Sequence, residues 1–209
     1  MTKLKAVIFD IDGVLIDSVK ANAVFFERIF KQIGVKYSKA EYIRLNHMTM
    51  WQIIEHFTGE TSERKIRKIW EFAKQFPYPY ELVKVPKDSI RTVAWLSRKF
   101  KLAVVTARVK KGVKPVLQRY GYGAYFKTAI CFEDYKNPKP DPEPLLKALK
   151  KLKIKPSEAV YVGDMPSDVQ CAHAAGVKSI FFSSRKNKKA DYNVKSFKQL
   201  RELLENYAG

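Results

Sequence analysis

Four short segments of the chain carry side chains whose types and spacing are suited to chemistry. Each combines acids, a hydroxyl or a cation, and the four are 10–18 (DIDGVLIDS), 105–108 (VTAR), 137–142 (NPKPDP) and 163–168 (GDMPSD). The first and last contain closely spaced aspartates, whose oxygens are the ligands that a hard cation such as Mg²⁺ prefers. The middle two contain a hydroxyl and an ammonium group, which are donors for an anion. The set points to metal-assisted chemistry on an anionic substrate.

Alternating apolar and amphipathic stretches place these segments at the ends of β-strands. Apolar runs predict strands at 4–9, 102–106, 128–132, 159–163 and 178–182, and amphipathic stretches predict helices at 88–99, 110–120, 142–152, 167–175 and 197–207. Strands separated by helices of this length form βαβ crossovers, so we expect an α/β fold with a Rossmann-like, doubly wound parallel sheet. Ligands of such a sheet bind beyond the carboxyl ends of its strands, where the four segments should converge.

One long helical stretch interrupts this alternation. Between the first strand and the second, residues 18–86 show only helical spacing of apolar residues, until the segment 76–80 (FPYPY) breaks the pattern. We therefore expect an inserted domain of about four helices. The predicted organisation is a core domain at 1–17 and 87–209 and a helical domain at 18–86.

The ordered motifs DxDGxLxDS, T, KP and GDxxxD closely resemble those of the haloacid dehalogenase superfamily, over about two thirds of the chain. The inserted helices resemble the α-helical cap of the phosphoglycolate phosphatase and β-phosphoglucomutase type. The resemblance implies a Mg²⁺-dependent hydrolase that acts as a phosphatase on a small phosphomonoester. The sequence shows no signal peptide and no apolar stretch long enough to cross a membrane, so we expect a cytoplasmic location. Haloalkanoate dehalogenases have no acid where Asp12 stands, so the dehalogenase reaction is disfavoured.

The resemblance also assigns roles in catalysis. Asp10 would attack the phosphorus and form an aspartyl-phosphate, and Asp12 would protonate the leaving alcohol and then activate water. Asp10, the main-chain carbonyl of Asp12, and Asp164 would hold Mg²⁺, which is needed because a carboxylate and a phosphate repel each other.

Three further residues complete this assignment. Thr106 and Lys139 would bind the phosphate oxygens that do not transfer. Asp168 follows Asp164 by one helical turn, and would orient Lys139 or bind a metal-bound water.

The inserted domain would choose the substrate. The segment 44–51 lies where relatives that act on sugar phosphates have a glycine-containing loop followed by a substrate-binding arginine. Here His47 stands near the position of that glycine, and Met50 stands near the position of that arginine. A second phosphate needs a cation, so this departure disfavours a phosphomutase or phosphotransferase on bisphosphorylated sugars. Arg44 or Arg108 could replace the missing cation, and we predict substrate contacts for His47 and Arg108.

Structural explanations compete at several of these positions. Ser18 could cap the first inserted helix, and Asp164 with Pro166 resembles an ordinary helix start. Met48, Met50 and Trp51 could form part of the core of the inserted domain, and Arg108 could face solvent at a helix start. Substitution and assay of substrate preference separate these alternatives from the functional ones.

Composition restricts the class of protein. The formal net charge is +19 with a pI of about 9.8, which makes a nucleic-acid-binding protein an alternative, although the complete set of reactive residues makes it unlikely on this sequence. Two cysteines at positions 131 and 171 cannot build a disulfide framework or a close metal pair. No apolar stretch is long enough to cross a membrane, so we expect no membrane contact, and the oligomeric state is left open.

Overall fold

The computed structural model describes residues 3–46 and 48–207 and divides into two compact units. One unit comprises Met1–Ile16 with Val85–Gly209, and the other comprises Asp17–Lys84. The domain limits predicted from the sequence lie one residue from the first of these boundaries and two residues from the second. Each unit has its own core and is described separately.

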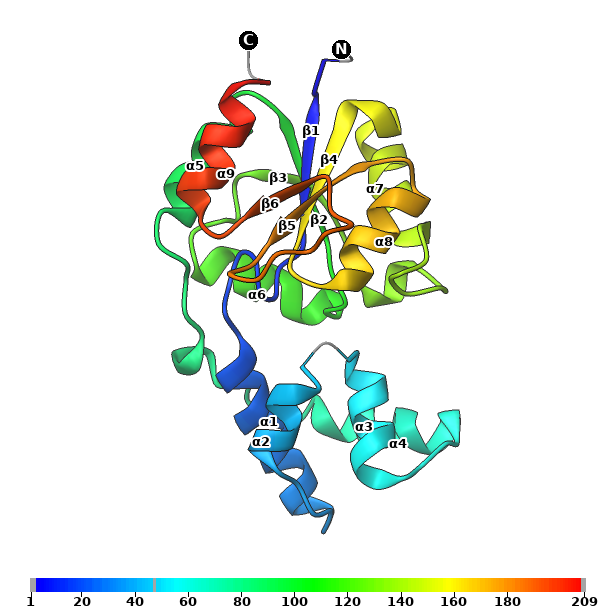
Figure 1. Cartoon of the computed structure of the whole chain (residues 1–209). Coiled ribbons are helices and arrows are strands. Elements are labelled where there is room, and N and C mark those ends of the chain that lie inside the picture. The colour runs from blue at the N-terminus through cyan, green and yellow to red at the C-terminus, as the bar shows by residue number, and fades with distance from the viewer. Residues whose placement is uncertain (1–2, 47, 208–209) are drawn as a thin grey trace. The chain divides into compact units, whose positions relative to one another are not determined.

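The larger unit is built on a parallel sheet with the order β3-β2-β1-β4-β5-β6 in the described part of the chain (Figure 1). Its strands are β1 (Ala6–Phe9), β2 (Lys101–Val105), β3 (Phe126–Ile130), β4 (Ala159–Gly163), β5 (Lys178–Phe182) and β6 (Tyr192–Val194). Strand β1 is central, because it pairs with β2 and with β4. The carboxyl ends of β1, β2 and β4 therefore lie next to one another, as expected for a doubly wound α/β fold.

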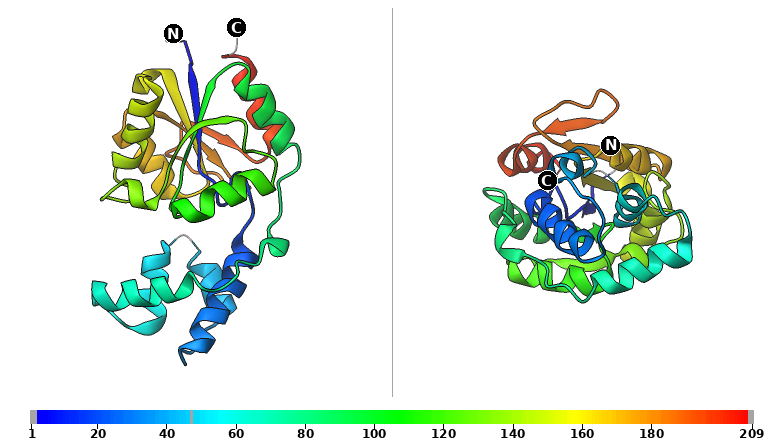
Figure 2. Two further views of the ribbon diagram at one scale, coloured as in Figure 1. Left: turned by 180° about the vertical axis from the view of Figure 1, so that it is seen from behind. Right: turned by 90° about the horizontal axis from the view of Figure 1, so that it is seen from below.

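Helices cover both faces of this sheet. Helices α7 (Glu143–Leu152) and α8 (Pro166–Ala174) pack on one face, and α5 (Ser89–Ser97) and α9 (Phe197–Glu205) on the other, as Figures 1 and 2 show from opposite sides. Helix α6 (Lys110–Arg119) links β2 to β3, and short 3-10 turns lie at Phe132–Asp134 and Pro156–Glu158. The α/β fold class inferred from the sequence is thus confirmed.

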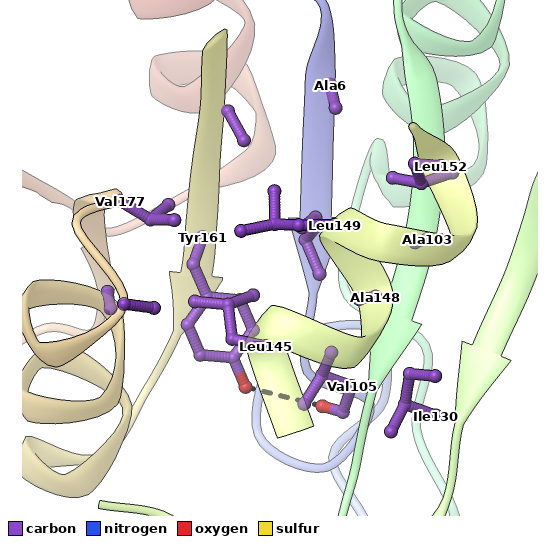
Figure 3. Packing of buried hydrophobic residues seen from close by; sticks show 14 of the residues in the cluster. Ala6, Ala103, Val105, Ile130, Leu145, Ala148, Leu149, Leu152, Tyr161 and Val177 are labelled. Atoms are coloured by element: carbon purple, nitrogen blue, oxygen red, sulfur yellow. Dashed lines mark hydrogen bonds between the residues drawn. The ribbon is translucent and has the colours of Figure 1, made fainter. Parts of the chain in front are cut away.

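The core between the sheet and α7 follows the alternation of the strands. Figure 3 shows Leu145, Leu149 and Leu152 of α7 above side chains from every second position of β1, β2 and β4. Those strand residues are Ala6, Ile8, Ala103, Val105, Ala159 and Tyr161, all nearly or fully buried. Because each strand is buried on both faces, its sequence reads as a continuous apolar run, and this explains why the strands were recognisable.

Two differences from the predicted elements have physical causes. Strand β3 ends at Ile130 instead of residue 132, because the chain turns at Cys131 into a 3-10 turn whose Asp134 carboxylate accepts from the Cys131 amide. Strand β6 was not predicted. It has three residues, YNV, and pairs with β5 at the edge of the sheet, so it lacks the apolar run that identifies a buried strand.

The smaller unit is helical throughout its described residues. It contains α1 (Val19–Gln32), α2 (Lys39–Arg44), α3 (Met50–Thr58), α4 (Glu63–Ala73) and a 3-10 turn at Tyr80–Leu82. An aromatic core that includes Phe26, Phe30 and Tyr42 joins α1 to the other helices. The two ends of this unit are paired by two backbone hydrogen bonds. The amide of Asp17 donates to the carbonyl of Lys84 at 2.8 Å, and the amide of Lys84 donates to the carbonyl of Asp17 at 3.0 Å.

Candidate active site

Asp10 lies directly after the central strand β1, with its side chain 10% exposed. The backbone amide of Asp10 donates to the carbonyl of Val162 on the neighbouring strand β4, which continues the sheet pairing by one residue. One carboxylate oxygen accepts from the ammonium of Lys139 at 2.8 Å. Residues that are 129 positions apart in the sequence are thus in contact at the carboxyl end of the sheet.

Lys139 is held by three partners in a nearly buried position. Its ammonium also donates to Asp168 Oδ1 at 2.6 Å and to the Tyr161 hydroxyl at 3.1 Å, and Tyr161 in turn donates to Asp168. Burial opposes the charge on Lys139, but the carboxylates of Asp10 and Asp168 outweigh it and raise the pKa of Lys139 well above its usual value. Lys139 is therefore a fixed positive charge.

The loop that carries Lys139 is fastened to the start of α7. The carboxylate of Glu143, the first residue of α7, accepts from the backbone amides of Lys136 and Asn137. The Asp141 carboxylate accepts from the Glu143 amide at 2.8 Å, and the Lys139–Pro140 peptide bond is cis. Hydrogen bonds on both sides of Lys139 therefore fix where its side chain begins.

Three aspartates from two strand ends form a cluster. One carboxylate oxygen from each of Asp10, Asp164 and Asp168 lies within 4.8 Å of the others. Burial raises the pKa of Asp164 to about 8, with the charges of Asp168 and Asp10 adding to the effect. Burial is also the main cause that raises the pKa of Asp10 to about 6, although Lys139 opposes it. The cluster has more negative charge than Lys139 compensates.

This excess of charge fits a divalent cation. A hard cation bound by carboxylate oxygens offsets the repulsion between them, and Asp10 and Asp164 have the oxygen chemistry that Mg²⁺ prefers. Asp168 differs from them, because Lys139 and Tyr161 donate to its Oδ1 and the Met165 amide donates to its Oδ2. Both oxygens of Asp168 thus already accept hydrogen bonds, and one of the donors is Lys139.

Two glycines allow the aspartates to come this close. Gly13 has a φ of +78°, and a Cβ there would lie 2.0 Å from Asp164 Oδ2. A Cβ on Gly163 would lie 2.3 Å from Cβ of Asp168. Any larger residue at either position would displace an aspartate of the cluster.

Thr106 and Arg108 follow the end of β2. Thr106 is 1% exposed, and its Oγ1 accepts from the backbone amide of Arg108 at 3.2 Å. The Arg108 guanidinium binds the carboxylate of Asp12 through two parallel hydrogen bonds, from Nε to Oδ2 at 2.6 Å and from Nη2 to Oδ1 at 2.7 Å. Arg108 thus contacts the residue for which we predicted acid and base chemistry.

Of the two residues predicted to contact the substrate, Arg108 belongs to the larger unit. His47 is outside the described residues, so its predicted contact with substrate stays a prediction. Met48, Met50 and Trp51 pack against the aromatic core of that unit, which agrees with the structural explanation of these side chains. Thr49 caps α3 through the Gln52 amide, and Ser18 makes no side-chain cap with the amides of α1.

Tyr161, Glu143 and the Asp12–Arg108 pair are the parts of the site that sequence reasoning missed. The sequence predicts Tyr161 only as one residue of an apolar strand, and nothing in a single sequence shows that its hydroxyl contacts Lys139. Glu143 had a signal, since an acid in the first turn of a helix often binds preceding amides.

The two cysteines do not provide a nucleophile. Cys131 and Cys171 are buried, and burial raises their pKa values to about 11 and about 12, so both stay protonated near neutral pH. The described residues also include no helix long and apolar enough to cross a membrane.

Known proteins resemble the chain over most of its length. The sequence is 29% identical to a putative pyrophosphatase PpaX from Caldanaerobacter subterraneus, over 97% of this chain and 95% of the relative. It is also 29% identical to a phosphoglycolate phosphatase from Pseudomonas savastanoi, over 86% of this chain and 69% of the relative.

Solved structures show the same fold. A subfamily IA hydrolase of the haloacid dehalogenase superfamily from Geobacter sulfurreducens matches with a TM-score of 0.74 and 29% identity, over 96% of each chain. A putative phosphoglycolate phosphatase from Lactobacillus plantarum matches with a TM-score of 0.83 and 23% identity, over 97% of this chain and all of that one. The family model for haloacid dehalogenase-like hydrolases covers residues 7–182, which include all four reactive segments. The chain is therefore a hydrolase that belongs to the haloacid dehalogenase-like family.

Proposed function

We propose that the protein is a Mg²⁺-dependent phosphatase that hydrolyses a small phosphomonoester through an aspartyl-phosphate on Asp10. The observation that carries the proposal is the contact of Asp10 with Lys139 at 2.8 Å inside a cluster of aspartates. A nucleophilic carboxylate, a fixed ammonium and an uncompensated acidic cluster are the parts that phosphoryl transfer requires. The relatives named as phosphatases support the same reaction class.

Asp10 and Asp164 are the carboxylates proposed to hold Mg²⁺, together with the main-chain carbonyl of Asp12. The cation, when bound, lowers the repulsion between the acidic cluster and a phosphate and draws charge from the phosphate oxygens. Lys139 and the Thr106 hydroxyl bind the oxygens that do not transfer. These donors are fixed before the substrate arrives, and fixed donors stabilise a transition state without a cost of reorganisation.

The reaction divides into two balanced steps. In the first, an oxygen of Asp10 forms a bond to phosphorus while the bond to the leaving oxygen breaks, and that oxygen takes a proton from Asp12. In the second, Asp12 takes a proton from water, the water oxygen bonds to phosphorus, and the bond from phosphorus to Asp10 breaks. The products are an alcohol and inorganic phosphate, and both carboxyl groups return to their starting state.

The helical unit Asp17–Lys84 is proposed to act as the cap that selects the substrate. Met50 occupies the position near which sugar-phosphate enzymes have an arginine, so a phosphomutase stays the less favoured alternative. Phosphoglycolate and simple sugar phosphates are the proposed substrates, and the proposed location is the cytoplasm.

Substitution of Asp10 tests the proposal. Asp10→Asn should lower Mg²⁺-dependent phosphate release by at least about 1000-fold, since removal of a nucleophile that acts in a concerted site costs that much or more. The control is Asp88→Asn, because Asp88 is exposed and its side chain caps no helix amide. A phosphorylated peptide containing residue 10, recovered from the wild-type enzyme after acid quenching, would identify the intermediate. Intact activity in Asp10→Asn would refute the proposal.

A further inference from the structure

The pairing of Arg108 with Asp12 occupies the proposed acid. Both carboxylate oxygens of Asp12 accept hydrogen bonds from the guanidinium, at 2.6 and 2.7 Å. Proton transfer to the leaving oxygen of a substrate requires a direct contact with one of these oxygens or one intervening water. In this arrangement, the guanidinium already occupies an acceptor site on each of them.

Hydrogen bonds fix the backbone of Arg108, from which its long side chain extends. Its amide donates to Thr106 Oγ1 at 3.2 Å, and its carbonyl accepts from the Phe132 amide at 2.9 Å. The backbone is thus held by the residues that follow β2 and β3, so a change of partner would involve the side chain alone. A fixed backbone with a long side chain suits a group that changes partners without a movement of the strands.

The ion pair between Lys139 and Asp10 is a more deeply buried contact with which the pair of Arg108 and Asp12 can be compared. Lys139 and Asp10 are each 10% exposed, and Lys139 has Asp168 as a further carboxylate partner that is 2% exposed. The side chain of Asp12, by contrast, is 32% exposed, and that of Arg108 is 13% exposed. Water that reaches Asp12 lowers the cost of separating this pair relative to the more deeply buried pair of Lys139 and Asp10.

We propose that Arg108 is a positioning residue that holds Asp12 until an anionic group on the leaving part of the substrate takes the guanidinium over. This inference rests on the proposed phosphatase function and adds a condition to it. The exchange replaces one two-point contact of the guanidinium with another, so the charge of Arg108 stays compensated throughout. It also frees an oxygen of Asp12 for the leaving oxygen only when that substrate is bound.

The two parallel donors of the Arg108 guanidinium, Nε and Nη2, define the class of substrate. A guanidinium that binds one carboxylate through two parallel hydrogen bonds matches another carboxylate or a phosphate equally well. The preferred substrate is therefore a phosphate ester or anhydride whose leaving portion has a negative charge of its own. A neutral alcohol as leaving group does not displace Asp12, and its esters are turned over slowly.

Matched substrates test the exchange. Phosphoglycolate has a carboxylate on its leaving group, pyrophosphate has a phosphate there, and 2-hydroxyethyl phosphate has a neutral hydroxyl of similar size. The variants are Arg108→Gln, which removes the charge, and Arg108→Lys, which keeps the charge without the two parallel donors. Arg98→Gln is the control, because Arg98 is exposed at the end of α5. Steady-state kcat and KM are measured for each enzyme with Mg²⁺.

Opposite effects on the two kinds of substrate are expected. Arg108→Gln should lower kcat/KM for the substrate with the charged leaving group by roughly 10- to 100-fold, as the loss of a charge-assisted pair does. The same variant should raise kcat for 2-hydroxyethyl phosphate, because Asp12 is no longer held. Arg108→Lys should fall between the two enzymes. Whether phosphoglycolate or pyrophosphate shows the loss identifies carboxylate or phosphate as the displacing group.

Two other outcomes would overturn the inference. One is an equal loss on the charged and neutral substrates in Arg108→Gln, which a merely structural role would produce. The other is a ratio of kcat/KM on the charged substrate to kcat/KM on the neutral substrate that is the same in Arg108→Gln as in Arg98→Gln. If wild type hydrolyses these esters and Asp10→Asn does not, such results refute the exchange of partners by Arg108 and leave the proposed phosphatase function standing. If Asp10→Asn is as active as wild type, the proposed function itself has failed.

Discussion

A single hydroxyl group contacts both Lys139 and the carboxylate that holds it. The Tyr161 hydroxyl contacts Lys139 and Asp168, each at 3.1 Å, and lies 3.3 Å from the carbonyl of Val105 at the end of β2 (Figure 3 shows the last contact). Burial is the first cause that raises the pKa of Tyr161 well above its usual value, so the hydroxyl stays neutral. It links the end of β2 and the middle of β4 to the ammonium that is proposed to bind the substrate.

Removal of this hydroxyl should affect the reaction more than the fold. We expect Tyr161→Phe to lower kcat roughly tenfold, since the loss of one hydrogen bond to a charged group costs about that much in a transition state. Thermal unfolding measured by circular dichroism should shift by only a few degrees. Tyr192→Phe is the control, because its hydroxyl pairs with Tyr207 at the sheet edge. Equal effects of the two variants on kcat would contradict the role given to Tyr161.

The residues of the site were easier to predict than their contacts. The sequence predicts Asp10, Thr106 and Asp164 as site residues because each lies in a short motif at a strand end, and Lys139 because its motif precedes a helix. The pairing of Asp12 with Arg108 joins residues that are 96 positions apart, and it depends on side-chain rotamers that a single sequence does not show.

At the scale of elements, the tight turn after β1 determines how close the acidic cluster becomes. The Gly13 amide donates to the carbonyl of Ile16 at 2.8 Å, and the amide of Ile16 donates to the carbonyl of Ile11. The turn therefore closes on itself and presents the open side of Gly13 to Asp164. One position of this turn combines a left-handed backbone with a close approach to a proposed metal ligand.

Gly13→Ala should separate these two demands when it is compared with Gly34→Ala. Gly34 has a φ of +70° but no atom within 4 Å of an added Cβ, so its substitution should cost only the left-handed strain, about 1–2 kcal/mol of unfolding free energy. Gly13→Ala adds the clash with Asp164 and should lower phosphate release on the order of 100-fold, as small misplacements of reacting groups do. The Mg²⁺ concentration for half-maximal activity should rise in Gly13→Ala alone. The same concentration in both variants would show that Asp164 tolerates displacement.

Elements with strong apolar periodicity were predicted well, and short edge elements were not. The runs AVYVG and KSIFF lie at β4 and β5 with the predicted bounds, because burial on both faces requires continuous apolar sequence. Strand β6 has one buried residue in three, and its pairing depends on the presence of β5. Its position is a tertiary effect, which local sequence cannot encode.

At the scale of the whole molecule, the backbone pair Asp17–Lys84 makes the helical unit removable. The two residues exchange amide hydrogen bonds of 2.8 and 3.0 Å, so a loop of about two to four residues can join them. A chain that lacks residues 18–83 and has a short Gly-Ser linker should unfold cooperatively on heating. It should still hydrolyse p-nitrophenyl phosphate, whose leaving group needs no proton, and lose discrimination among alkyl phosphates.

The intact chain is the reference for this deletion. Calorimetry of both proteins would show whether the α/β unit keeps a single transition, and a panel of phosphoesters would measure the discrimination. A deletion variant without cooperative unfolding would show that the α/β unit needs the helices for its stability. Unchanged discrimination would show that the helical unit does not choose the substrate.

The central place of β1 has a consequence for how the protein is made. This strand is synthesised before its two neighbours, which are residues 101–105 and 159–163, so both of its edges lack their partners until those residues have been made. Contacts this distant in sequence slow folding and leave an apolar strand open to aggregation. The helical unit is synthesised in between, so we expect it to fold before the sheet is complete. The acidic cluster can therefore form only after the segment that contains Asp164 and Asp168 has left the ribosome.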